Sequence, residues 1–266
     1  MIEKDLTIIL LLYNTPRNLI KNLHVYKHFK ILILDQSNDY NLKKKITKFL
    51  PNIEFYKVTN NNLGFAKGVN FLVKKVKTKY FLCTQVDVLV SNKTILSLKK
   101  TFLKKKDCII SIPSLKNKIS KKKIFSVNSF IGAIFLANKK RFLELKGFDE
   151  DYFFYWEDID FSYKIKGSNY KIYLSSISKA THLYGKSTSS TFTVYLLKNL
   201  NFRYGEYLFN YKNKKLKIIK LIRDPIFFIV KLIFSIILFN KLRLYKSIAN
   251  LLGILKFYKY LIKSLI

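Results

Sequence analysis

Acidic residues are scarce in this chain of 266 residues, which has 16 Asp and Glu against 50 Lys and Arg and a formal net charge of +34. Such an excess of positive charge predicts polyanions nearby: lipid head groups, nucleic acid or phosphorylated substrates. The imbalance is greatest in residues 191–266, where 15 Lys and Arg face only Glu206 and Asp224. Charge alone does not choose among these partners.

Cysteine, histidine and glycine are also rare, with two, three and eight residues. Cys83 and Cys108 are too few for a disulfide framework, and the absence of a Cys/His cluster argues against zinc. A reducing, cytoplasmic environment is therefore expected. Neither a G-x-G-x-x-G nor a G-x-x-x-x-G-K-[ST] motif occurs, which argues against a dinucleotide fingerprint and a P-loop. The apolar run 6–13 has no cleavage motif of a secretory signal and is predicted to be a buried strand.

Apolar residues make up 49% of the chain, enough for a proper core. In the first hundred residues, short apolar runs alternate with helically spaced ones, which predicts a mostly parallel sheet covered by helices. The predicted strands are Leu6–Leu12, Ile31–Leu34 and Tyr80–Cys83, and the predicted helices fall within Leu19–Phe29, Ile46–Leu50 and Phe71–Val76. Lysine-rich connections at 104–106 and 116–123 precede another apolar segment, 125–137. In such sheets, ligands bind beyond the carboxyl ends of the strands, where Asp35 and Asp87 stand.

Six of the 16 carboxylates lie within the twelve residues Asp149–Asp160, in the stretch GFDEDYFFYWEDID. Carboxylates placed among the aromatic residues 153–156 are partly desolvated, which raises their basicity and suits proton abstraction or metal binding. A surface acidic loop that balances nearby lysines is the alternative. This stretch is the candidate active site.

Three other features carry possible chemistry. The Gly- and Asn-rich loop Asn60–Asn70 leads into a helical pattern, and its backbone could approach a phosphate closely. Asp87 follows an apolar strand, where a carboxylate suits a divalent cation that bridges two phosphates, although a lone Asp could equally cap a turn. His182 follows the acidic stretch, and a structural role is the default for a single histidine.

The chain becomes helical from about Phe192 onward. Asp224 and Pro225 predict a helix start before the apolar segment Ile226–Phe239, whose 14 residues fall short of the roughly 20 that cross a bilayer. Further apolar residues at helical spacing between 244 and 262 have lysines on another face. This pattern predicts a helix on an anionic membrane surface, or a core helix with a solvated lysine face.

An ordered series of motifs runs from about residue 6 to 188. It comprises a strand ending in Y-N, an L-D-Q-S-N-D segment, an N-x-G-F-A-x-G-x-N loop, a G-A pair, a G-F-D-E block followed by E-D-x-D, and H-x-x-G-x-S. These stand at Ile8–Asn14, Leu34–Asp39, Asn62–Asn70, Gly132–Ala133, Gly147–Asp160 and His182–Ser187. The series resembles the family-two inverting glycosyltransferases of the GT-A fold, particularly the rhamnosyltransferase-like branch that builds bacterial surface polysaccharides.

The resemblance implies a role for each matching residue. Asp158 would be the general base. Glu157 and Asp160, three residues apart on one helix face, could hold the acceptor or support Asp158. Asp87 would hold Mg²⁺ or Mn²⁺ on the donor diphosphate as the single acid of Gln85-Val86-Asp87. The residues expected at the nucleotide sugar are Asn14, Asp35, Asn62, Gly64, Asn70 and His182. Asp35, Asp87 and Asp158 are thus expected around one cleft.

The resemblance further implies a domain organisation and partners. Residues 1–190 would form the GT-A domain, with a nucleotide-sugar half at 1–110 and an acceptor and catalytic half at 111–190, followed by a basic amphipathic helical tail at 191–266. The donor would be a dTDP- or UDP-linked sugar, and the acceptor lipid-linked or a polysaccharide. The charge and amphipathic pattern of the tail, which lies outside the resemblance, predict that it binds the inner face of the cell membrane. No nucleic acid is expected, because no aromatic interleaving typical of RNA-binding sheets occurs.

Two other classes of function stay open from the residues alone. A glycoside hydrolase also uses two carboxylates but needs no nucleotide. A non-catalytic polyanion-binding protein would need only the charge.

Overall fold

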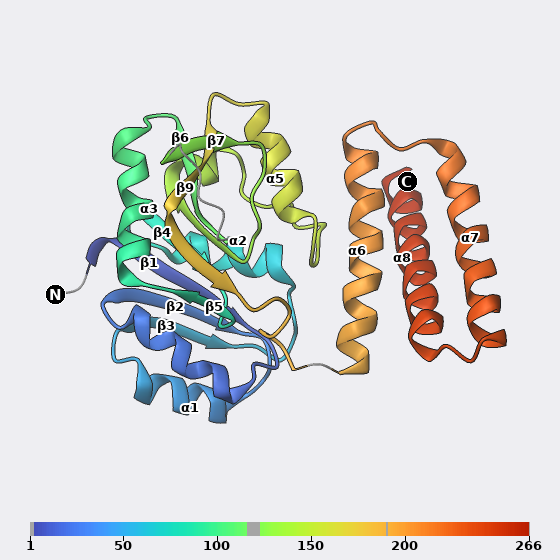
Figure 1. The fold of residues 1–266 in the computed structure, drawn as a ribbon, viewed down its shortest axis with the longest axis horizontal. Helices are drawn as coiled ribbons and strands as arrows, with labels where there is room; N and C mark the ends of the chain where they lie inside the picture. Colours follow the sequence, from blue (N-terminus) through green and yellow to red (C-terminus); the bar gives the residue numbers. More distant parts are fainter. Residues whose placement is uncertain (1–2, 116–122, 190, 266) are drawn as a thin grey trace. The chain divides into compact units, whose positions relative to one another are not determined.

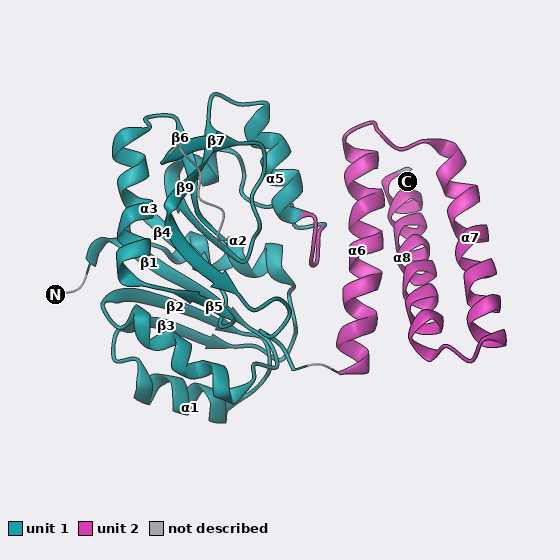
Figure 2. Cartoon of the chain, viewed as in Figure 1, with its two compact units in different colours: residues 1–151, 157–189 teal, residues 152–156, 190–266 magenta. Residues whose placement is uncertain are grey.

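A computed structural model describes residues 3–115, 123–189 and 191–265, so most of the lysine-rich connection 116–123 lies outside the described residues. The chain forms two compact units (Figure 2). Unit 1 comprises residues 1–151 and 157–189, and unit 2 comprises residues 152–156 and 190–266.

Unit 1 is an α/β unit whose helices flank one sheet (Figure 1). Its strands are β1 (Glu3–Leu12), β2 (Phe29–Asp35), β3 (Ile53–Val58), β4 (Tyr80–Thr84), β5 (Val88–Val90), β6 (Cys108–Ser114), β7 (Ile124–Val127), β8 (Ile134–Asn138) and β9 (Lys171–His182). Its helices are η1 (Arg17–Tyr26), α1 (Tyr40–Phe49), α2 (Phe65–Lys75), α3 (Asn92–Lys104), α4 (Lys139–Glu144) and α5 (Glu157–Lys166).

The strand order is β3-β2-β1-β4-β8-β6-β9-β5, with β7 also paired to β9. Strands β1 to β4 pair in parallel, as do β6 and β9, whereas β8 is antiparallel to both β4 and β6. The strands β5 and β7 each pair antiparallel with β9. This mostly parallel, helix-flanked sheet confirms the predicted fold class.

The buried residues of unit 1 explain why these segments became strands. The side chains of Ile8, Ile9 and Leu10 on β1 are all fully buried, because consecutive residues of a covered strand face two apolar layers. An aromatic group supports one layer through the edge-to-face contacts of Phe81, Phe142 and Phe148. The predicted helical segment 19–29 differs from the structure: a 3₁₀ helix ends at Tyr26, and β2 already begins at Phe29.

Unit 2 contains three helices, α6 (Phe192–Lys212), α7 (Ile218–Ile237) and α8 (Lys241–Leu265) (Figure 1). Aromatic and aliphatic side chains fill its core, among them Tyr204, Tyr207 and Phe257. The segment 152–156 belongs to this core through the buried ring of Tyr152. Among the described residues, none of the helices combines the length and the apolar character that crossing a bilayer requires.

The predicted helix start at Asp224 and Pro225 is wrong. The helix α7 begins at Ile218 and carries Pro225 inside it. Proline has no N–H, so the carbonyl of Leu221 one turn earlier loses its helical partner. The hydroxyl of Tyr258 on α8 donates to this carbonyl instead. Packing between the two helices thus replaces the hydrogen bond that proline removes.

Candidate functional site

The strand register brings three of the predicted carboxylates to one edge of the sheet. Asp35 ends β2 opposite Leu12 of β1, and Thr84 of β4 lies opposite Leu10 of the same strand. Asp87 follows β4 after a short turn. Because parallel strands end at the same edge, Asp35 and Asp87 share the carboxyl edge of the sheet.

Asp158 reaches this edge through the antiparallel strand β8. Ile134 at the start of β8 pairs with Thr84 at the end of β4. Two residues before Ile134, the backbone N–H of Gly132 donates to Asp158 Oδ2 at 2.8 Å. A side chain at position 132 would meet Phe65 and approach the Asp158 carboxylate, so glycine allows this close contact. The carboxylate of Asp158 is therefore held at the edge that carries Asp87.

Asp35 organises the β2 end of the edge and is fully buried. Its carboxylate accepts hydrogen bonds from the N–H of Ser37 at 2.9 Å and from the hydroxyl of Tyr56 at 3.0 Å. Burial, followed by the charge of Asp35, raises the pKa of Tyr56, which keeps this hydroxyl a donor. The neighbouring Gln36 accepts from the N–H of Leu63 at 2.7 Å and so ties the loop before α2 to the end of β2.

Asp87 holds the loop that follows β9. Its Oδ2 accepts from the N–H groups of Lys186 and Ser187 at 3.1 and 3.0 Å and lies 3.5 Å from His182 Nε2. The same loop reaches the end of β1, where the N–H of Ser189 donates to the carbonyl of Asn14 at 2.9 Å. The loop therefore crosses the carboxyl edge from β4 to β1.

The surroundings of Asp87 keep its carboxylate charged. Its burial would raise the pKa, but the hydrogen bond and charge of His182, together with the N–H of Ser187, outweigh that effect and hold the pKa below its ordinary value. Within the described residues, Asp87 Oδ1 and His182 Nδ1 are buried and have no hydrogen-bond partner. An ionised oxygen and an imidazole nitrogen left unpaired in a protein interior are unusual and point to a missing ligand.

A carboxylate oxygen and an imidazole nitrogen are the types of atom that can bind a divalent cation that arrives with a phosphate. The residues that the structure describes contain no group of three or more His, Cys, Asp or Glu side chains able to hold a metal. Mg²⁺ and Mn²⁺ bound with substrate phosphates commonly take one or two protein ligands and fill the other positions with phosphate oxygens and water. Asp87 and His182 suit that kind of site better than a permanent metal centre.

Glu157 and Asp158 differ although they are neighbours on α5. Glu157 is buried, and burial together with the charge of Asp158 raises its pKa well above the ordinary value. Its charge also adds to the effect of burial in raising the pKa of the Cys83 thiol, so Glu157 is close to the central strand β4. Asp158 is half-buried, and its pKa is raised by burial against the lowering effect of the Gly132 and Ile159 N–H groups. Only Asp158 combines raised basicity with partial exposure.

The remaining predicted residues have contacts of their own. Asn70 is buried and bridges α2 to the backbone of Phe148, with an N–H and a C=O of that residue both engaged. Asp160 forms an ion pair with Lys164 at 3.2 Å, one turn along α5. Asn62 Oδ1 accepts from the N–H of Gly64 at 2.9 Å, which shapes the turn before α2. Asn70 and Asp160 therefore support the loops and helix around the edge.

The aromatic residues 152–156, which precede Glu157 and Asp158 in the sequence, belong to unit 2. The ring of Trp156 packs on Phe202 and Phe209 of α6, in unit 2. Tyr155 and Trp156 both have left-handed backbone angles, with φ of 69° and 75°. The ring that the structure places beside Asp158, across Gly132, is that of Phe65.

Residues 7–161, more than half of the chain, match the model of the glycosyl transferase family 2. The chain belongs to this family. The match includes Asp35, Asp87 and Asp158, and family membership together with the fold confirms the predicted class of protein. The proposed rhamnosyltransferase-like branch is a narrower prediction that this match does not address.

Solved structures of other glycosyltransferases share the fold of this family 2 chain. GalNAc-T7, with UDP, GalNAc and Mn²⁺, has a TM-score of 0.61 at 14% identity over 76% of this chain and 47% of its own. The mannosyltransferase PcManGT of Pyrobaculum calidifontis, with GDP-Man and Mn²⁺, has a TM-score of 0.57 at 12% identity over 81% and 65%. TarS residues 1–349 of S. aureus have a TM-score of 0.54 at 14% identity over 96% and 91%.

This chain thus spans about half the length of the first of these structures and about two thirds of the second. No curated protein sequence matches it. At these identities the similarity establishes the fold of this family 2 member.

Three residues around the edge escaped the sequence analysis. Tyr56 and Gln36 bind Asp35 and the loop before α2, as described above. Tyr184 is 63% exposed, and its ring lies 4.4 Å from that of His182. Its position within the H-x-x-G-x-S segment was the available signal. The side chain is an exposed aromatic surface beside His182.

Burying Glu157 has a measurable cost in stability. The pKa of Glu157 is raised because the folded protein favours the protonated carboxyl. The free energy of unfolding is therefore highest at low pH, where Glu157 is protonated, and it falls as the pH rises through the raised pKa. We expect Glu157→Gln, which stays neutral, to unfold at a higher temperature than the parent at pH 8 and at a similar one at pH 4. Each pKa unit corresponds to about 1.4 kcal/mol, and 1 kcal/mol to roughly 2–4 °C.

Thermal unfolding followed by circular dichroism at the two pH values measures this difference. The control is Glu54→Gln, which removes an exposed carboxylate paired with Lys30 and should change stability by less than about 0.5 kcal/mol. A Glu157→Gln protein that is less stable than the parent at pH 8 would show that the buried carboxylate is held in its charged form.

Proposed function

We propose that the protein is an inverting glycosyltransferase that moves a sugar from a nucleotide-diphosphate donor to a hydroxyl group. The observation that carries this proposal is the convergence of Asp35, Asp87 and Asp158 on one carboxyl edge of the sheet. The family and the donors named for the solved relatives, UDP and GDP-Man, support it. A dTDP- or UDP-linked sugar is our preferred donor.

Asp158 would act as the general base. A carboxylate within hydrogen-bond reach of the acceptor hydroxyl removes its proton as the oxygen attacks the anomeric carbon. The bond from that carbon to the diphosphate breaks, the electron pair leaves with the phosphate, and the proton stays on Asp158. A single displacement inverts the configuration of the carbon. Partial burial raises the basicity of Asp158 and so favours the proton transfer.

Asp87 and His182 would hold Mg²⁺ or Mn²⁺ against the donor diphosphate. When bound, the cation stabilises the charge that develops on the leaving phosphate. On the other side of the edge, Asn14, Asp35, Asn62 and Gly64 would lie against the nucleotide.

The acceptor in this proposal is lipid-linked or a polysaccharide of a bacterial cell surface, as in the rhamnosyltransferase-like branch. The acidic residues of helices α6 to α8 are Glu206 and Asp224, and both form ion pairs. Glu206 pairs with Arg203 and Lys220, and Asp224 pairs with Arg223. The excess of Lys and Arg over acidic residues in 191–266 supports binding to the anionic inner face of the cell membrane. The protein would then be cytoplasmic and peripherally attached.

The test is thermal unfolding with nucleotide-diphosphate sugars of several bases, with and without Mn²⁺. A correct donor at a concentration of 100 times its Kd adds about 2.7 kcal/mol, a shift of roughly 5–10 °C. We expect the shift to need both donor and metal and to depend on the base. No shift with any donor would favour a hydrolase, and equal stabilisation by heparin or any nucleic acid would favour a non-catalytic polyanion-binding protein.

A further inference from the structure

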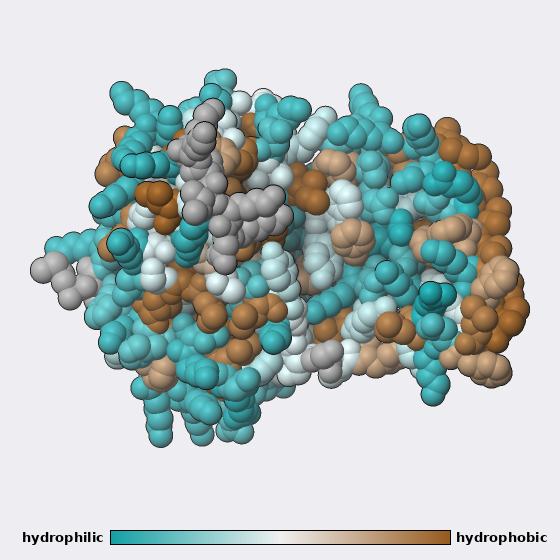
Figure 3. Space-filling model, viewed as in Figure 1, coloured by the Kyte–Doolittle hydropathy of each residue, from teal (hydrophilic) through white to brown (hydrophobic). Residues whose placement is uncertain are grey.

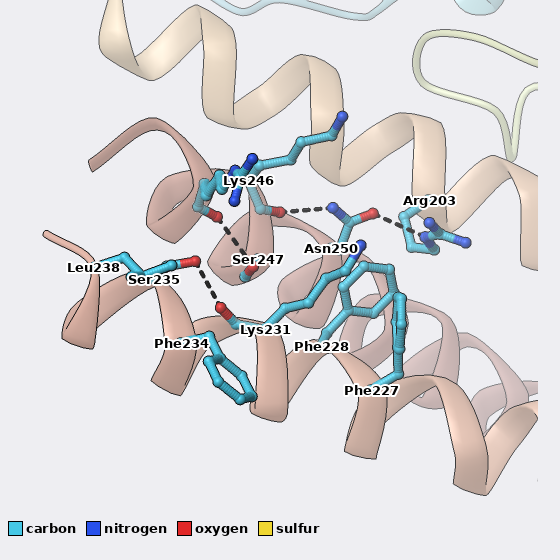
Figure 4. A pocket seen from close by; sticks show the side chains of 11 residues that line it. Arg203, Phe227, Phe228, Lys231, Phe234, Ser235, Leu238, Lys246, Ser247 and Asn250 are labelled. Carbon is cyan, nitrogen blue, oxygen red and sulfur yellow. Dashed lines mark hydrogen bonds between the residues drawn. The ribbon is translucent and has the colours of Figure 1, made fainter. Parts of the chain in front are cut away.

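A cavity of about 600 Å³ lies within unit 2, between α7 and α8 (Figure 4). One wall comes from Phe227, Phe228, Lys231, Phe234 and Ser235 of α7 and from Leu238, the residue that follows this helix. The facing wall comes from Arg243, Lys246, Ser247 and Asn250 of α8, and Arg203 of α6 closes one end. Four cationic side chains therefore surround a partly aromatic cavity, and none of the lining residues is acidic.

Three of these four cations have no carboxylate partner. Arg203 is neutralised by Glu206 at 2.6 Å and fixed by Asn250 at 2.8 Å. In the described part of the chain, Lys231, Arg243 and Lys246 form no ion pair, and all three are exposed. Lys231 also lies over the ring of Phe227 at 4.3 Å, and three cations without a carboxylate partner around one cavity favour the binding of an anion. The chemistry complementary to this cavity is a phosphate group.

An apolar surface adjoins the cavity along α7. Its exposed side chains include Phe234, Ile236, Ile237 and Leu238, of which Phe234 and Leu238 also line the cavity. Figure 3 shows this hydrophobic surface as brown spheres over α7. Exposed apolar side chains continue toward the start of the helix, at Ile218, Ile222, Ile226, Ile229, Val230 and Ile233. Exposed apolar patches of this extent mark interaction or membrane surfaces.

We propose that the cavity binds the phosphate head group of an anionic membrane lipid, while the apolar face of α7 lies among the acyl chains. This inference rests on the membrane association proposed above and adds the site and the orientation. A phosphate joined to an acyl chain matches both the unpaired cations and the adjoining apolar face. Nucleic acid would match only the charge, because a phosphodiester backbone presents no acyl chain to an apolar helix face.

Two double variants of α8 separate this site from general electrostatic attraction. Arg243→Gln with Lys246→Gln removes two cavity cations. The control, Lys241→Gln with Lys259→Gln, removes two exposed cations that lie nine residues on either side of Asn250, about two and a half turns away and hence on the opposite face. Both variants lose the same charge from the same helix.

The measurement is co-sedimentation of the full-length protein with phosphatidylcholine vesicles, with and without phosphatidylglycerol. A cation at an anionic surface contributes about 1 kcal/mol, so the cavity variant should bind phosphatidylglycerol vesicles roughly 30-fold more weakly, and the control less than about threefold. Far-ultraviolet circular dichroism and the unfolding temperature establish that both variants are folded. Phe234→Ser should also weaken binding to the vesicles. Because this change removes an apolar contact and no charge, the loss should be of the same size at low and at high salt.

Each outcome has a distinct meaning. Equal losses in the two double variants would overturn the cavity as a specific site and leave diffuse attraction in its place. Release of the protein from vesicles by inorganic phosphate, with Phe234→Ser binding normally, would make the ligand a free phosphate and also contradict the proposal. If the parent protein ignores anionic vesicles, membrane association itself fails, whereas glycosyl transfer is tested separately by donor-dependent thermal shifts.

Discussion

Replacing Asp158 by Asn is expected to lower the rate of sugar transfer by a factor of about 10² to 10⁴ while the donor still binds. Asparagine keeps the shape of the side chain, and its one carbonyl can replace either Oδ2, which accepts from the N–H of Gly132, or Oδ1, which accepts from that of Ile159. It has no basicity, so the acceptor hydroxyl must lose its proton to water. The measurement is the transfer rate at saturating donor, together with the donor-induced shift in unfolding temperature.

The pH profile tests whether the lost group is the base. Burial raises the pKa of Asp158, and a base works only when deprotonated, so the parent rate should rise with pH through that raised pKa. This limb should be absent from Asp158→Asn. The matched control is Asp151→Asn, an exposed carboxylate of the same acidic block, which should keep both rate and profile. Unchanged turnover in Asp158→Asn would falsify the assignment.

The sequence predicts which residues lie at the carboxyl edge of the sheet, because that placement depends only on which apolar segments are parallel strands. Asp35 and Asp87 follow apolar strands, and parallel strands place their carboxyl ends together wherever the helices pack. Asp158 was assigned through the family resemblance. Its position depends on a hydrogen bond to Gly132, 26 residues earlier, which no local pattern encodes.

Local rules failed where tertiary contacts replace local ones. Pro225 marks a helix start by propensity, yet α7 continues through it because Tyr258 satisfies the freed carbonyl of Leu221. The amide of Asn70, a residue predicted at the nucleotide sugar, binds the backbone of Phe148, a contact that no local pattern encodes. Trp156 of the acidic stretch packs against Gly205, at a distance that only a residue without a side chain allows. Each case needs partners far away in the sequence.

Replacing Asp87 by Asn is expected to abolish metal-dependent donor binding and to lower transfer by a factor of about 10² or more, as loss of one charge-stabilising group typically does. The variant should still fold, because asparagine can keep the hydrogen bonds that Asp87 accepts from the loop. The Asn carbonyl can take the place of Oδ2, which accepts from Lys186 and Ser187. The amide nitrogen then occupies the position of Oδ1, which lacks a partner among the described residues. Only the negative charge and the free oxygen are lost.

Isothermal titration calorimetry of Mn²⁺ into protein with UDP tests whether Asp87 binds the metal or only holds the loop 183–187 through hydrogen bonds. If Asp87 serves only to hold the loop 183–187, Asp87→Asn binds Mn²⁺ like the parent, because the two N–H bonds remain. If it is a ligand, the affinity for Mn²⁺ falls while the protein still folds without metal, at a lower unfolding temperature because the fold stabilises the charged form of Asp87. Asp107→Asn is the control, since the carboxylate of Asp107 pairs with Tyr173 and Lys171, far from the edge. His182→Gln should weaken Mn²⁺ binding as well, because the low pKa of Asp87 depends on His182 and the pair is expected to act as one unit.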